Sequence, residues 1–192
     1  MKPLLTLCAY ALIFLPATSY GQQAAEAPSQ SAQGSAVQEK ERDAKETTKV
    51  LQDLACGPDE VRHSVRTVHE PQVLPAQPAD KALIYVIRPT HYGMLAQTKL
   101  AVDKSWVGVN RANNYFYFTL NPGPHHFCSE MGRKTLLTVR SLSLLSVVVE
   151  AGKTYYLQQK ITYGGNDLEL LSEEEGKKGL EKCRLSAFAE KK

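Results

Sequence analysis

The sequence predicts a mainly β protein, an antiparallel β-sandwich with a short C-terminal α-helix. From residue 81 onward, short apolar runs recur between turns that contain glycine or proline, which is typical of a two-layer β domain. Apolar and polar side chains alternate on both sides of Gly152, the period of two that a half-buried strand requires. Ser172 precedes three glutamates, and this pattern predicts a helix start.

The first 21 residues are typical of a secretory signal peptide. Lys2 precedes an apolar run over residues 4–15, and small residues surround the expected cleavage site after Gly21. The run is well short of the ~20 residues that span a bilayer, so we expect no transmembrane anchor. In a lipoprotein signal the apolar run precedes the modified cysteine, whereas Cys8 lies inside the run, so we expect no lipid anchor. We therefore expect an exported protein, periplasmic or extracellular after cleavage.

Residues 22–55 predict a low-complexity spacer followed by a marginal helix. Residues 22–36 are rich in Ala, Gln and Ser and cannot bury a core. Residues 37–54 are good helix formers with few apolar positions, so we expect docking through the last turn at most. A lead-in segment over 56–80 contains a cysteine, a weak strand over 61–68 and a proline-rich linker.

The β-sandwich domain is expected over residues 81–192. A type II turn at Asn121-Pro122-Gly123 follows the strongly β-prone YFYFTL run. Pro89 ends the first strand, which is apolar on both faces and therefore expected to be covered on both. We expect strands over residues 82–87, 98–102, 106–107, 115–120, 135–140, 144–149, 154–161 and 168–171.

The stretch 144–158 predicts a β-hairpin around which the sheet is arranged. A three-residue loop, Glu150 to Gly152, places the apolar residues of both runs on one face, whereas a two-residue loop does not. Gly152 then occupies the third loop position, where a positive φ favours glycine. The residues of this apolar face are Leu145, Val147, Val149, Tyr155 and Leu157.

The C-terminal helix is predicted to begin with a capping box of Ser172 and Glu175. Two glycines inside the helix weaken it by about 1 kcal/mol each. We therefore expect docking through Leu180 and Cys183 to hold it in place.

Charge and cysteine content limit the function classes. The net charge is +3, and removal of residues 1–21 takes away only Lys2, leaving +3 − 1 = +2, too little for nucleic-acid binding. Cys56, Cys128 and Cys183 remain, and three cysteines allow three single pairings with one left over. We favour Cys56–Cys128, which joins the lead-in segment to the sheet and contributes about 4 kcal/mol. Three separate thiols remain the alternative.

His91, His125 and His126 are the candidate metal ligands. Adjacent side chains on a strand point to opposite faces, so His125 and His126 are poorly placed to share an ion, and no metal-binding spacing accompanies them. We expect ordinary strand-edge histidines, no metal site and no cofactor.

No motif for a nucleophile or a phosphate loop is present, and the histidines have no identifiable carboxylate partner in the sequence. We therefore expect a protein that is not an enzyme. A periplasmic hydrolase or metal-dependent enzyme stays open, because catalytic groups also assemble from distant residues.

Trp106, Tyr115 and Tyr117 are the candidate ligand-binding residues, as an aromatic surface for a sugar or a peptide. Tyr115 and Tyr117 share one face of a strand, and the phenylalanines between and after them share the other, which we expect to face the core. Packing of the tyrosine face under a loop or helix is the favoured interpretation, and exposure to a ligand is the alternative.

Six stretches share their order and spacing with a known family. They resemble DUF2846, a bacterial family of exported β-domains without an established activity, from about residue 56 to the end. The Asp103-Lys104 turn lacks the glycine that the family often has there. This turn and the Pro-Gly-x-His segment are also similar to the PEGA repeat, a small immunoglobulin-like sandwich. The stretches are Cys56–Val61, Lys81–Pro89, Ala101–Gly108, Tyr115–Cys128, Val149–Leu157 and Leu171–Cys183.

We expect an exported, non-catalytic binding or structural module associated with the cell envelope. Its expected partner is a cell-wall polymer or an envelope protein. Besides the enzyme alternative, a subunit whose sheet edge adds to a partner's strand stays open.

Overall fold

The computed structural model describes residues 45–58, 61–132, 141–163 and 165–190. The expected signal peptide, the 22–36 spacer and the expected strand over 135–140 lie outside these residues. The described elements are β1 (His63–Thr67), β2 (Ala82–Arg88), β3 (Thr98–Val102), β4 (Ser105–Asn110), β5 (Asn114–Leu120), β6 (Gly123–Met131), β7 (Ser141–Val149), β8 (Thr154–Thr162), β9 (Gly165–Leu171), α2 (Glu173–Leu180) and β10 (Arg184–Glu190).

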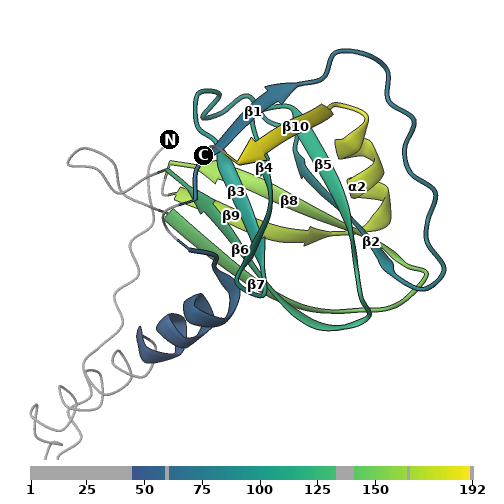
Figure 1. Ribbon diagram of the computed structural model, residues 1–192. Helices are drawn as coiled ribbons and strands as arrows, with labels where there is room; N and C mark the ends of the chain where they lie inside the picture. Colours follow the sequence, from purple (N-terminus) through teal and green to yellow (C-terminus); the bar gives the residue numbers. More distant parts are fainter. Residues whose placement is uncertain (1–44, 59–60, 133–140, 164, 191–192) are drawn as a thin grey trace, which may run out of the picture. The chain divides into compact units, whose positions relative to one another are not determined.

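Two sheets pack face to face, which confirms the predicted β-sandwich (Figure 1). One sheet has the strand order β1-β10-β5-β2-β8-β9, and the other has the order β4-β3-β6-β7. Most neighbouring strands run antiparallel. The β2–β8 and β10–β5 pairs are parallel, so the larger sheet is mixed rather than purely antiparallel.

The predicted hairpin at 144–158 is wrong, because its two strands belong to different sheets. β7 pairs with β6, whereas β8 pairs with β2 and β9. The connection between them crosses from one sheet to the other, and it bonds to the start of β2 through Gly152 N to Lys81 O (3.0 Å). The apolar residues of both strands do share one core, but they face each other across it. Apolar and polar residues alternate with a period of two both in a hairpin and in two strands that cross between sheets. The sequence pattern therefore does not distinguish the two arrangements.

The core between the sheets is built from the inward residues of both layers. Phe116 of β5 and Phe127 of β6 are 1% exposed, and the predicted assignment of the phenylalanine face to the core is confirmed. Gly108 of β4 lies directly against the Phe116 ring, where a Cβ would overlap it. Gly108 lies within β4 and allows the two sheets to approach.

A network of buried polar side chains crosses the same core. Gln159 of β8 is fully buried; its Oε1 accepts from Thr98 Oγ1 (2.9 Å) and its Nε2 donates to Ser129 Oγ (3.0 Å). Asn110 donates to the same Oε1 (3.2 Å). Asn166 donates to the Ser129 carbonyl (3.0 Å). Each bond joins the two sheets, and a satisfied buried network fixes their register.

One lateral side of the sandwich is closed by side chains of β7. Ser141 Oγ accepts from Asn166 N (2.9 Å), and Ser143 Oγ accepts from Leu168 N (2.8 Å). These amides belong to β9, the edge strand of the larger sheet. These two edge amides are therefore already occupied, which protects this part of the edge from a partner strand.

β10 follows the helix and was not predicted. It pairs antiparallel with β1 and, at its start, parallel with β5. Its buried residue is Ser186, whose hydroxyl donates to Asn110 (3.0 Å). A strand whose inward position is a serine lacks the apolar alternation that identifies strands in a sequence.

α2 packs on the outer face of the larger sheet, and its predicted capping box is confirmed. Ser172 N donates to Glu175 Oε2 (3.1 Å). The two glycines are the contact surface of the helix. A Cβ on Gly176 would overlap the ring of Tyr156, and one on Gly179 would overlap the side chain of Ile87. Docking through Leu180, which is 9% exposed, is also confirmed.

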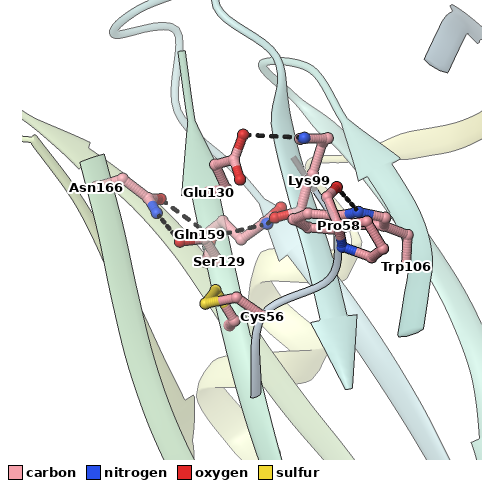
Figure 2. The surroundings of a disulfide bond; sticks show 9 residues. Cys56, Pro58, Lys99, Trp106, Ser129, Glu130, Gln159 and Asn166 are labelled. Carbon is pink, nitrogen blue, oxygen red and sulfur yellow. Dashed lines mark hydrogen bonds and ion pairs between the residues drawn. A yellow bond between two sulfur atoms is a disulfide. The ribbon is translucent and has the colours of Figure 1, made fainter. Parts of the chain in front are cut away.

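Residues 45–55 are helical, and the end of this helix covers the outer face of the smaller sheet. Ala55 is buried, while residues 45–50 are exposed, as expected for docking through the last turn. Cys56 and Cys128 form the predicted disulfide (Figure 2). Gly57 lies against the Trp106 ring, and Trp106 Nε1 donates to Pro58 O (2.8 Å).

Candidate functional site

A pocket of about 640 Å³ lies on the outer face of the larger sheet. Its floor consists of side chains from β2, β5 and β8. One wall is the segment 68–74, which follows β1, and the other is formed by α2 and the start of β10. We call it the tyrosine pocket, after Tyr85, Tyr115 and Tyr156 in its floor.

The three tyrosines pack on one another. The rings of Tyr85 and Tyr156 stack with centroids 5.5 Å apart, and the ring of Tyr115 lies 6.3 Å from that of Tyr85. Burial raises the pKa of Tyr85 to about 12 and also raises the pKa values of the other two. The phenols are therefore neutral near pH 7. The three residues are only 3–5% exposed, and within the described part of the chain no hydrogen bond engages their hydroxyls.

The rim of the tyrosine pocket carries both signs of charge. Lys177 and Arg184 lie on one wall together with Glu181, and Glu70 lies on the other. Arg184 Nη1 donates to His69 Nδ1 (2.6 Å), which bridges the two walls. Because the guanidinium can only donate, Nδ1 of His69 accepts and the ring carries its proton on Nε2. The rim offers donors and acceptors to a polar ligand.

Cys183 is the free thiol of the described residues, and it also lines the tyrosine pocket. Burial raises its pKa to about 11. The thiol is therefore protonated near pH 7 and is a weak nucleophile.

The structure separates the three candidate ligand residues. Tyr115 lines the tyrosine pocket, and Tyr117 lies beside it on the same face, 39% exposed, with its ring 5.9 Å from that of Tyr85. Trp106 lies on β4 of the other sheet, with Lys99 Nζ 4.1 Å above its ring. The three residues therefore do not form one aromatic surface. Tyr85 and Tyr156 were missed, because each looks like an ordinary core residue of an apolar run.

The three candidate metal ligands have separate partners. His91 contacts Asn113 (2.9 Å), and His126 Nδ1 contacts Ser146 Oγ (2.8 Å). His125 Nδ1 lies 2.6 Å from Asp103 Oδ2, and its Nε2 lies 2.9 Å from the Asn121 carbonyl. Asp103 is the carboxylate partner that the sequence did not reveal. Both ring nitrogens of His125 face acceptors, so neither is directed at a substrate.

The described part of the chain contains no group of three or more His, Cys, Asp or Glu side chains that could hold a metal ion. Within these same ranges no helix has the length and apolarity needed to cross a membrane.

Comparison with known proteins supports the family resemblance. A protein of Haemophilus influenzae, named only as uncharacterized, is 30% identical over 107 residues; the match covers 54% of this chain and 60% of that protein. No solved structure matches the chain significantly. The similarity to the PEGA repeat stays a prediction. The family model of DUF2846, described as a protein of unknown function, matches residues 78–171, and the resemblance to this family seen in the sequence is confirmed.

Proposed function

We propose that this protein is a non-catalytic binding module that acts at the cell envelope after export and takes its ligand in the tyrosine pocket. The observation that supports this best is the pocket itself. Its volume of about 640 Å³ lies within the roughly 300–1,000 Å³ of small-molecule sites. An aromatic floor with a few charged groups at the rim is the usual composition of such sites.

The chemistry of the tyrosine pocket suits a segment of a cell-wall polymer. Such a segment presents sugar hydroxyls, amides, carboxylates and amines. The neutral phenols of the floor both donate and accept hydrogen bonds. Arg184 and Lys177 suit a carboxylate, and Glu70 and Glu181 suit an amine.

The thiol and the imidazoles near the two sheets are engaged in ways that support binding rather than catalysis. The thiol of Cys183 is held in its protonated form by burial. His69 uses Nδ1 to accept from Arg184, and His125 has both ring nitrogens engaged. A general base needs a nitrogen that is free to take a proton from the reacting group.

Co-sedimentation with purified cell-wall sacculi tests the proposal. We expect the wild type to pellet and the variants Arg184→Gln and Tyr115→Phe to pellet less, because each removes a donor that faces the pocket. Arg66→Gln is the matched control, since Arg66 is an exposed arginine on β1 outside the pocket. Wild-type protein that stays in the supernatant while folded would exclude the cell wall as ligand. If Arg66→Gln loses as much co-sedimentation as the two pocket variants, the tyrosine pocket is excluded as the binding site.

A further inference from the structure

The loop over residues 89–97, between β2 and β3, exposes three large apolar side chains. Tyr92 is 54% exposed, Met94 is 60% exposed and Leu95 is 95% exposed. Single exposed apolar residues are ordinary, but a cluster on one short loop marks an interaction surface. We call this segment the β2–β3 loop.

A fourth exposed side chain lies at the same end of the sandwich. β2 and β8 are parallel neighbours, so their ends meet. Gly93 has a positive φ of 65° and lies against the side chain of Ile161 near the end of β8. Tyr163 follows two residues later and is 100% exposed. Tyr163 therefore lies at the same end of the sandwich as the β2–β3 loop.

The β2–β3 loop is held in shape by a buried arginine. Arg88 is fully buried, and its guanidinium donates to the carbonyls of Ala96 (2.8 Å), Gly93 (2.6 Å) and Tyr92 (3.2 Å). Its Nε has no partner among the described residues. Burial lowers the pKa of Arg88 to about 10, so the group stays charged near pH 7. Burying a charge is costly, and here the three hydrogen bonds of the guanidinium fix the loop. A loop that is ordered before binding loses less entropy on binding.

The charges of the β2–β3 loop and of the turn beside it favour an anionic partner. The β2–β3 loop contains no acidic residue, and neither does the neighbouring turn over residues 111–113. Asn113 joins the two through His91 (2.9 Å) and through its amide to the Arg88 carbonyl (2.7 Å). Arg111, in that turn, is exposed.

We propose that the β2–β3 loop binds the surface of an anionic lipid bilayer, with Met94 and Leu95 inserted and Tyr92 and Tyr163 at the headgroup level. Leu95 and Tyr163 are 95% and 100% exposed, so both side chains are free to enter a bilayer. Tyrosine is enriched at the interface between lipid and water, and Arg111 would lie above anionic headgroups. This contact uses a surface of the molecule other than the tyrosine pocket.

Flotation with lipid vesicles tests the proposal on the processed chain, whose N-terminus is first verified by mass. We expect wild type to float with vesicles of phosphatidylethanolamine and phosphatidylglycerol, and much less with phosphatidylcholine alone. Leu95→Ser should weaken partitioning about ten-fold, the effect of withdrawing one leucine side chain from lipid. Val73→Ser is the matched control, because Val73 is also 95% exposed but lies on the segment after β1.

A second pair of variants tests the electrostatic part. Arg111→Glu should weaken binding to the anionic vesicles about five-fold or more at low salt, and Arg66→Glu should not. High salt should reduce this difference. The proposal is overturned if folded wild type fails to float with anionic vesicles, or if Leu95→Ser and Val73→Ser float equally. If the wild type binds no vesicles but binds an envelope protein that Leu95→Ser does not bind, the proposal is also overturned, and the partner is that protein.

Discussion

The outer faces of the two sheets are covered in opposite ways. On the smaller sheet, a covalent bond from Cys56 to Cys128 and the contact of Gly57 with Trp106 hold the covering segment tightly. On the larger sheet, α2 and the segment 68–74 cover the tyrosines without a covalent link and leave about 640 Å³ between them. On the first face the covering segment seals the sheet, and on the second we propose that it forms the wall of a binding site. We place stability on the first face and binding on the second.

The largest effect is expected from removal of the disulfide. The two cysteines are 72 residues apart, and closing a loop of that length contributes about 4 kcal/mol in the chain-entropy model. The double variant Cys56→Ser/Cys128→Ser should lose about that much free energy of unfolding, measured with urea. Cys183→Ser is the control and should lose far less. A double variant as stable as wild type would show that the smaller sheet is not sealed by this bond.

The next largest loss of stability is expected on the outer face of the larger sheet, where α2 packs. Gly176→Ala would normally stabilise a helix, but here the new methyl group would overlap the Tyr156 ring. We expect a net loss of about 1–3 kcal/mol as α2 is pushed from the sheet. Lys178→Ala, on the exposed side of the helix, should be close to neutral. Urea unfolding measures both, and a stabilised Gly176→Ala would mean that α2 does not pack as closely as described.

A smaller effect is expected at Trp106. Trp106→Phe loses the hydrogen bond to the Pro58 carbonyl and weakens the contact with Lys99. The free energy of unfolding should fall by about 1 kcal/mol, followed by circular dichroism. Binding to sacculi should be unchanged, because Trp106 lies on the sheet opposite the tyrosine pocket. Loss of binding would contradict the assignment of the two faces.

The smallest effect is expected from the pH dependence of the Asp103 contact. Partial burial acts to raise the pKa of Asp103, but the hydrogen bonds from His125 and from the amide of His126 outweigh it and leave the pKa below its usual value. A lowered folded pKa gives stability that is present above the usual carboxyl range and is lost as the pH falls through the folded pKa. Asp103 is 45% exposed, so we expect less than about 1 kcal/mol. Asp103→Asn should flatten this part of the stability curve below about pH 4 and leave the rest unchanged.

The sequence predicts the local elements well, because local signals determine them. The bounds of β3 agree with the prediction, β2 differs by one residue, and the capping box of Ser172 and Glu175 is present. The pairing of strands that are far apart in the chain is not determined by local signals. Alternation around Gly152 does not tell whether the next strand folds back into its own sheet or crosses to the other. Cys56 with Cys128 was preferred from position alone, and the structure bears it out.

The candidate site was predicted only in part. Tyr115 was recognised, but Tyr85 joins it through the antiparallel pairing of β5 with β2, and Tyr156 joins Tyr85 through the parallel pairing of β2 with β8; no local pattern shows either. The polar core was missed because a lone glutamine such as Gln159 is typical of a surface strand position. β10 was missed for the same reason, since its inward residue is a serine.

Protection of Cys183 from alkylation tests the central claim most directly. Cys183 lines the tyrosine pocket and is the free thiol of the described chain, so a ligand in the pocket should shield it. Its pKa of about 11 requires a reaction at alkaline pH, with mass spectrometry to follow the modified thiol. We expect soluble cell-wall fragments to slow the alkylation of Cys183 in proportion to their binding. Fragments that bind the protein while Cys183 reacts at its original rate would contradict this expectation.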